Sequence, residues 1–216
     1  KTSELAIHFF HGNIGVIYKR ESWGLLNPKM LSEIDEIEFS EYLKRETSVI
    51  EGFSMAQDVG NYAVKGEKAF KENDFKTAIK RLEQAIIKSS KTWGPDKNKD
   101  AEYKSLYDFI EDNGRLEIPS DQVSNLEKIF ILLGDSNHRL ADYTQAKTSY
   151  EQALLVNKSS LRAKYQLGVT CANNNEIDEA FDIFSECIDQ HDHVGSYYSR
   201  GVLYFVTKNL KDAKID

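Results

Sequence analysis

Apolar residues recur along most of the chain with the spacing of helices that bury one face. The stretch after Asp74 shows this clearly, because Ala78, Leu82, Ala85 and Ile86 fall on one side of a helix. Short polar stretches such as Glu72–Asp74 separate one apolar segment from the next and predict turns. The pattern therefore predicts amphipathic helices in pairs, joined by short turns.

The helical pattern also repeats. Glycines at 66, 134, 168 and 201 stand 68, 34 and 33 residues apart, and an alanine follows each of them by twelve residues. A large apolar residue precedes each alanine by three positions, and in three units another follows it by four. The matched residues are Phe75, Ala78 and Leu82, then Tyr143, Ala146 and Tyr150, then Ile177, Ala180 and Phe184, and finally Leu210 and Ala213. Small residues let two helices approach closely, and bulky ones fill the space between successive pairs.

This register resembles the tetratricopeptide repeat. It is visible in KGEKAFKENDFKTAIKRLEQAI, LGDSNHRLADYTQAKTSYEQAL and LGVTCANNNEIDEAFDIFSECI, and a fourth copy begins at RGVLYFVTKNLKDAKID. The resemblance implies an all-α fold, a right-handed superhelical array of antiparallel helix pairs over residues 59–216. Its units are about 59–92, 127–160, 161–193 and an incomplete 194–216, and we expect the array to continue past Asp216. The proline that usually ends a unit is replaced by Ser90, Lys158 and Asp192.

Two segments lie outside this register. Residues 93–126 lack the glycine and the alanine in register, and KDAEYKSLYDFIED predicts a helix, so we expect an insertion of a helix and a loop, with a decayed repeat as the alternative. Pro119–Asp121 predicts the start of the helix that follows. Residues 1–58 form an irregular N-terminal segment, in which ELAIHFF and IGVIYKR fit a hairpin and a helix equally. A hairpin would indicate the remnant of a preceding domain, and a helix would indicate a cap on the array.

Charge, hydropathy and cysteine content limit the kinds of partner and the cellular location that we expect. The net charge is −7, which argues against nucleic-acid binding. The longest apolar run, Ile129–Leu133, is far shorter than the roughly 20 residues that a membrane helix needs. Cys171 and Cys187 form no disulfide or ligand framework, which favours the cytoplasm, with the nucleus as a second possibility. Both cysteines fall at small-residue positions of the repeat, so we expect them in the core.

Few residues suggest catalysis or metal binding. His8 and His11 could share one face of a helix, but no acidic or cysteine partner stands at a supporting spacing, so packing or surface roles are favoured over metal binding. His191, Asp192 and His193 fall at a predicted turn between units, where a solvated turn is favoured over a surface metal site. Nucleophile-elbow, phosphate-loop and dinucleotide motifs are absent from the sequence. We therefore expect no catalytic residue, no cofactor and no metal.

The resemblance implies a binding surface instead. In the tetratricopeptide-repeat family the first helix of each pair lines the concave face, where ligands commonly lie. The matching positions here are Ala63, Glu67, Lys128, Ile131, Leu132, Asp135, His138, Arg162, Tyr165, Gln166, Val169, Tyr198, Val202 and Phe205. Because two tyrosines and a phenylalanine among them have no obvious core role, we expect a scaffold or adaptor that holds an apolar, aromatic-containing peptide segment or helix of another protein. A further helix of the protein itself filling the groove is the alternative.

Two other functions fit the resemblance less well. Chaperone cofactors of this family grip terminal carboxylates with lysine, asparagine and arginine. Here those positions hold Ala63, Glu67, Leu132 and Gln166, and only Arg162 is suitable, so a clamp would have to be modified. The array could instead regulate or target a larger enzyme. The sequence pattern does not indicate an oligomeric state.

Overall fold

The computed structural model describes residues 6–10, 13–17, 57–93 and 102–208, and the chain divides into two compact units, residues 1–49 and 50–216. In the first unit, β1 (Ala6–Phe10) pairs with antiparallel β2 (Asn13–Ile17), and Phe10 lies opposite Asn13. The hairpin interpretation is therefore confirmed and the helical one is wrong, because β-branched and aromatic residues dominate both strands. The domain remnant that a hairpin would indicate stays a prediction, and residues 18–56 lie outside the described residues.

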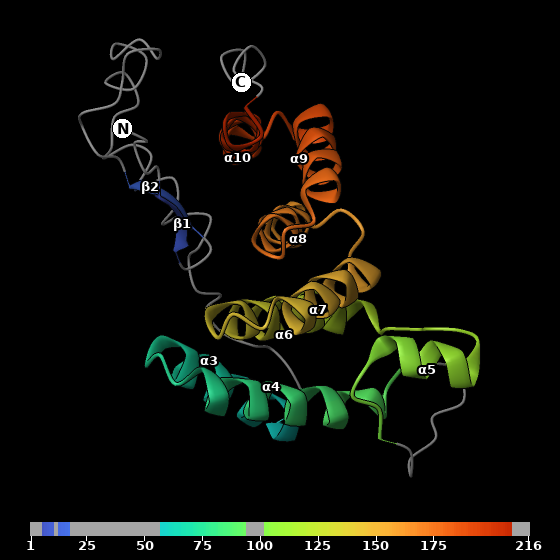
Figure 1. Ribbon diagram of the computed structural model, residues 1–216. Coiled ribbons are helices and arrows are strands. Elements are labelled where there is room, and N and C mark those ends of the chain that lie inside the picture. The colour runs from blue at the N-terminus through green and yellow to red at the C-terminus, as the bar shows by residue number, and fades with distance from the viewer. Residues whose placement is uncertain (1–5, 11–12, 18–56, 94–101, 209–216) are drawn as a thin grey trace. The chain divides into compact units, whose positions relative to one another are not determined.

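The second unit is an array of helix pairs, as Figure 1 shows. Its pairs are α3 (Gln57–Lys71) with α4 (Phe75–Ser90), α6 (Ser120–Arg139) with α7 (Tyr143–Val156), and α8 (Leu161–Asn173) with α9 (Ile177–His191), followed by α10 (Val194–Val206). Each pair packs on the next, and α10 packs against α9. The predicted all-α array is confirmed. We call α3, α6, α8 and α10 the first helices, and α4, α7 and α9 the second helices.

Glycine in the first helix lets each pair pack closely. A Cβ atom added at Gly134 would lie 2.6 Å from the ring of Tyr150, which is fully buried on α7. The equivalent atom at Gly168 would lie 2.7 Å from the ring of Phe184 on α9. Real Cβ atoms do not approach rings this closely, so a larger residue would push the two helices apart. The glycine periodicity seen in the sequence thus reports helix contacts within each pair.

The turn that follows each first helix contains one residue in the left-handed conformation. These residues are Asn73, Ala141, Asn175 and Lys208, with φ angles of 61°, 60°, 63° and 64°, and each stands seven residues after its repeat glycine. Asparagine tolerates this conformation better than other residues with a Cβ atom. In the first two turns an aspartate follows directly and caps the next helix, since Asp74 accepts from Thr77 N and Asp142 from Gln145 N.

The insertion leaves the stack uninterrupted. Helix α4 packs directly on α6, and Thr92 Oγ1, just past the end of α4, donates to Gln122 Oε1 at the start of α6 over 2.9 Å. Between them, in the part of the insertion that the structure describes, lies helix α5 (Leu106–Asn113). Helix α6 begins at Ser120, where Pro119 predicted a start, so its first residues fall inside the stretch 93–126.

The insertion is attached through an aromatic cluster and through hydrogen bonds to α4 and α7. The ring of Phe109 on α5 meets Trp93 at 5.8 Å and Tyr103 at 5.0 Å, both edge to face. At the start of α5, Leu106 N donates to Gln152 Oε1 of α7 over 2.8 Å. Helix α5 is therefore fixed against the second-helix side of the array.

Candidate functional site

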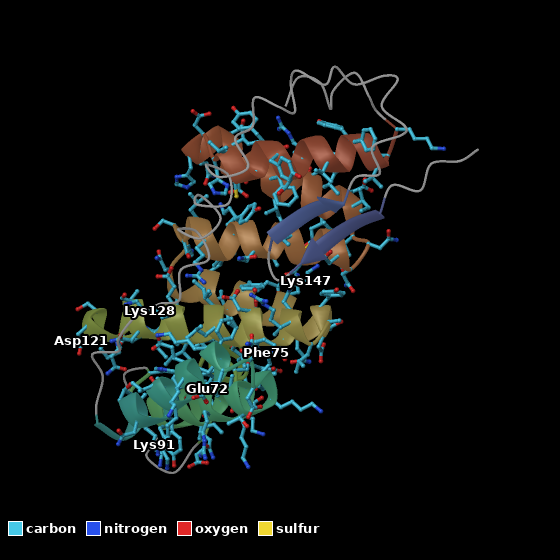
Figure 2. The ribbon with its side chains drawn as sticks, turned by 90° about the vertical axis from the view of Figure 1, so that its left-hand side faces the viewer. Glu72, Phe75, Lys91, Asp121, Lys128 and Lys147 are labelled. Atoms are coloured by element: carbon cyan, nitrogen blue, oxygen red, sulfur yellow. The ribbon has the colours of Figure 1, made fainter. Side chains whose placement is uncertain are left out.

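The ten residues that we single out as a binding surface lie on three first helices. Within each helix they stand three or four residues apart, which places them on one side. They are Lys128, Ile131, Asp135 and His138 of α6, Arg162, Tyr165 and Val169 of α8, and Tyr198, Val202 and Phe205 of α10. We call these ten residues, together with the adjoining Val64, Arg139 and Val206 of the same series of helices, the first-helix face. Figure 2 labels Lys128, which lies on α6 with Asp121.

Burial divides the ten residues into two groups. Ile131, His138, Tyr165, Val169 and Val202 are buried, with at most 9% of each exposed. The half-buried group consists of Lys128, Asp135, Arg162, Tyr198 and Phe205. In this arrangement, therefore, only the half-buried group has enough exposed surface to contact a partner.

Tyr165 has a core role, contrary to the expectation from the sequence. It is 4% exposed, and its ring lies 4.8 Å from the ring of His193 and 5.9 Å from that of Phe184. Its hydroxyl is 3.2 Å from Ser199 Oγ on α10. The side chain spans the junction between the third and fourth units, so its size is explained by packing. The expectation that Tyr165 lacks a core role is wrong.

Asp135 links three elements through one carboxylate. Tyr150 of α7 donates its hydroxyl to Oδ1 over 2.7 Å, and Arg162 Nη2 of α8 donates to Oδ2 over 3.1 Å. Burial raises the pKa of Tyr150 well above its usual value, and the neighbouring Asp135 charge raises it further, so the tyrosine stays a neutral donor. Arg162 thus ties the second unit to the third.

His138 makes a similar link. Its Nε2 lies 2.8 Å from Asn173 Nδ2 at the end of α8, and its ring meets Tyr143 of α7 at 5.3 Å. Asp135, His138 and Tyr165 therefore hold successive units in place. Several predicted site residues thus have a structural role, whatever else they contact.

Arg139 is the feature of this face that the sequence reasoning missed. Its guanidinium carbon lies 6.0 Å from the ring centre of Phe70 on α3 and 5.9 Å from that of Phe75 on α4. Burial lowers the pKa of Arg139, and the Asp135 charge opposes that shift. Helical spacing places this residue beside a predicted one, since Asp135 and Arg139 are four apart, but the groove positions implied by the family resemblance include only His138 in this last turn of α6.

The positions of the carboxylate clamp are filled otherwise. Ala63 and Leu132 are fully buried, and Gln166 is 4% exposed. Glu67 forms an ion pair with Lys71, whose Nζ lies 2.9 Å from Glu67 Oε1, and Arg162 is paired with Asp135. The one basic residue retained from the clamp pattern therefore already has a carboxylate partner.

A second cluster lies where the second and third units meet. Lys147 Nζ donates to Glu176 over 2.8 Å and to Glu179 over 2.6 Å, and the thiol of Cys171 lies close to both carboxylates. The lysine ammonium supplies the positive charge that a metal ion would bring, so the group is complete as an ion-pair network. Burial raises the pKa of Cys171 to about 12, which keeps it a thiol. Cys171 and Cys187 are both buried, as predicted.

The histidines near the end of α9 have local roles. His193 Nδ1 accepts from Ser196 N over 3.2 Å and so caps α10, and the side chain is 5% exposed. His191 is exposed in the last turn of α9. His8 lies in β1, which rules out the helical face that it would share with His11.

Comparison with known proteins agrees with this geometry. The family model described as tetratricopeptide repeat matches residues 127–160. The solved structure of YrrB, titled a TPR protein with an unusual peptide-binding site, is similar over 86% of this chain and 76% of its own, with 19% identity and a TM-score of 0.50. The OM64 TPR domain from Arabidopsis is 14% identical and covers 67% of this chain and 93% of its own, with a TM-score of 0.46. No curated protein matches the sequence.

The likeness to YrrB shows the fold alone, because the identity is low. Among the described residues, no helix is both long and apolar enough to cross a membrane. The repeat register, the stacked helix pairs and the family match lead to the same conclusion. The helical part of this chain has the fold of a tetratricopeptide-repeat array, and its residues 127–160 match the model of that family.

Proposed function

We propose that this protein is a non-catalytic adaptor that binds a segment of a partner protein along the first-helix face. Tetratricopeptide-repeat domains are scaffolds for protein–protein interaction and bind other proteins or peptides. They are generally without catalytic activity. The partner in this proposal is a peptide segment or a helix, and neither a nucleic acid nor a membrane. The cytoplasm, or else the nucleus, stays the predicted location.

The observation that supports this surface is the distribution of exposed apolar side chains. Among the described residues, five large apolar side chains are well exposed: Val64 (49%), Tyr107 (41%), Leu140 (42%), Val194 (58%) and Val206 (50%). Four of them lie on first helices or at the residue that ends one, and the fifth lies on α5. None of the five belongs to a second helix.

The second helices offer a different surface. In α9 the well-exposed residues include Asp178, Asp182 and Asp189, and the helix contains no lysine or arginine. Helix α4 exposes Lys76 and Lys80. Charged side chains of this kind are well solvated and are depleted from the centres of protein interfaces. Apolar contact with a partner is therefore more favourable on the first-helix side.

Neither alternative function gains support from the geometry. A chaperone-type clamp needs free basic groups. Here the basic residue Arg162 is paired with Asp135, and another clamp position holds the acidic residue Glu67, which is paired with Lys71. A regulatory role in a larger enzyme would use the same adaptor surface. The proposal therefore remains the adaptor.

The test compares charged substitutions on two sides of the domain. A Val64→Asp and Val206→Asp double variant places carboxylates on the first-helix face at side chains that are about half exposed, so folding should be preserved. Tyr107→Asp, a well-exposed apolar site on α5, is the matched control. Proteins captured from native lysate by the parent would be identified by mass spectrometry, and their affinities for all three forms measured with purified components.

We expect the double variant to bind the captured partner at least about tenfold more weakly than the parent, while the control binds normally. Circular dichroism and thermal melting of all three should agree. A partner that binds the double variant as tightly as the parent would show that the first-helix face is not the site. Loss of binding only in the Tyr107 variant would move the site to the insertion.

A further inference from the structure

Arg139 covers an aromatic pair at the junction of the first two units. The rings of Phe70 and Phe75 meet edge to face at 5.6 Å, and the Arg139 guanidinium lies about equally far from both. Phe75, labelled in Figure 2, begins α4, so the arginine extends from α6 onto the preceding helix pair. Stacking on a ring uses the flat face of a guanidinium and leaves the N–H donors at its edge available.

These edge donors lack a carboxylate in the described part of the domain. The side chain of Arg139 forms no ion pair or hydrogen bond there, although it is half-buried. The acidic residue four positions earlier, Asp135, already accepts from Tyr150 and Arg162. Glu67 of α3 is paired with Lys71. Arg139 is therefore an oriented cation whose N–H donors contact no carboxylate among the described residues, although the Asp135 charge acts on it from a distance.

We propose that Arg139 binds the side-chain carboxylate of an acidic residue within the partner segment. This inference rests on the proposed function and specifies the chemistry of the partner: an aspartate or glutamate with apolar neighbours. Arginine pairs with carboxylates through two parallel N–H···O bonds, which gives both strength and geometric selectivity. The ring stack holds the fork in place beforehand, so less side-chain freedom is lost on binding.

A side-chain carboxylate suits this position better than the end of a chain. The first-helix face continues on both sides of Arg139, toward Val64 on α3 and toward Arg162 on α8. A segment that lies along the face would pass Arg139 rather than stop there. The exposed side chain of Leu140 beside it offers a contact for an apolar neighbour of the acidic residue.

A purely structural role for Arg139 makes a different prediction. The residue lies in the last turn of α6, where any positive charge interacts favourably with the helix dipole. Lysine would keep that interaction but lacks the planar fork. Comparing arginine, lysine and glutamine at this position therefore separates charge from carboxylate recognition.

The experiment uses defined peptide pools with the full chain. Peptides of about 12 residues span roughly 40 Å when extended. Two pools share the same randomised apolar and polar positions and differ only at a central glutamate or glutamine, and all ends are acetylated and amidated. A third pool has the central glutamine and a free terminal carboxylate. Peptides retained by the immobilised protein are sequenced, and their affinities are measured by fluorescence anisotropy.

We expect the glutamate peptides to bind about tenfold tighter than their glutamine counterparts. Arg139→Gln should reduce that ratio to about one, and Arg139→Lys should give an intermediate ratio of about three. Lys76→Gln, which removes an exposed charge from α4, is the matched control and should leave the ratio unchanged. Thermal melting confirms that each variant is folded.

The outcomes separate this inference from the proposed function. Equal binding of glutamate and glutamine peptides by the parent, or a ratio that survives Arg139→Gln, would overturn the role of Arg139 and leave the adaptor function intact. Preferential binding of the third pool would assign the carboxylate to a chain end and also overturn the proposal. Failure of every pool to bind would contradict both.

Discussion

Replacing Ala141 with glycine should stabilise the domain. Ala141 is an exposed residue with φ 60° in the turn between α6 and α7. The corresponding turns of the first and third units have asparagine at this position, Asn73 and Asn175. A Cβ atom in the left-handed conformation crowds the following carbonyl, whereas glycine adopts this conformation without strain. The substitution removes that strain and, because the side chain is exposed, gives up little packing.

The size of the effect follows from two opposing contributions. Left-handed strain costs a residue with a Cβ atom about 1–2 kcal/mol. Glycine gains more freedom in the unfolded chain, which costs about 0.5–1 kcal/mol of stability. The free energy of unfolding should therefore rise by about 0.5–1 kcal/mol. For a domain of this size, the melting temperature would rise by roughly 2–3 °C.

Urea denaturation followed by circular dichroism measures this change, and the chain supplies its own control. Asn175→Ala makes the reverse substitution at the equivalent turn between α8 and α9, where the asparagine side chain is exposed. It should lower the free energy of unfolding by about 1 kcal/mol. A variant with both Ala141→Asn and Asn175→Ala should unfold close to the parent, since the two changes exchange one favourable turn for another.

A loss of stability in Ala141→Gly would refute this reasoning. It would mean that residue 141 does not adopt the left-handed conformation or that its methyl group has a packing role. Because repeat arrays can unfold in more than one step, the midpoint and slope of the urea curve should be compared for every variant.

Two further predictions concern packing and electrostatics. Gly134→Ala places a Cβ atom against the buried ring of Tyr150, so it should lower the free energy of unfolding by about 1–3 kcal/mol in urea denaturation; an unchanged midpoint would mean that the helix pair adjusts freely. Lys147→Met removes the bonds to Glu176 and Glu179 and should cost about 1 kcal/mol at neutral pH. The Lys147 bond lowers the pKa of Glu176, so that stabilisation is present above its ordinary value of 4.5 and is lost as the pH falls below it. Melting curves from pH 7 to pH 3 should show the parent and the variant converging, and a constant difference would contradict the assignment.

The fold was predictable because its constraints are local and repeated. The contacts of Gly134 with Tyr150 and of Gly168 with Phe184 recur at one spacing, so the chain displays the same helix contact several times. The hairpin at β1 and β2 was less certain from sequence. Its short apolar stretches fit both the helical and the strand periodicity, and the pairing of the two strands determines which structure forms.

The candidate site was harder to predict, because a side chain can face inward and still belong to the core. Tyr165 occupies a groove position by register, yet its role depends on Ser199, His193 and Phe184, which lie on other helices. Arg139 shows the opposite case. Its importance comes from two rings on the preceding pair, and the contact between a residue and a neighbouring unit is not visible in a single repeat.

The junction between α4 and α6 has a consequence for how such a domain can change during evolution. The bond from Thr92 to Gln122 holds the two ends of the insertion together. The packing of α4 on α6 therefore does not depend on the sequence between them. Lengthening a loop costs little, since each doubling of its length adds only about 0.6 kcal/mol of closure entropy. This junction is therefore a point at which the protein can acquire new sequence, or a grafted module, while the packing of its repeats is preserved.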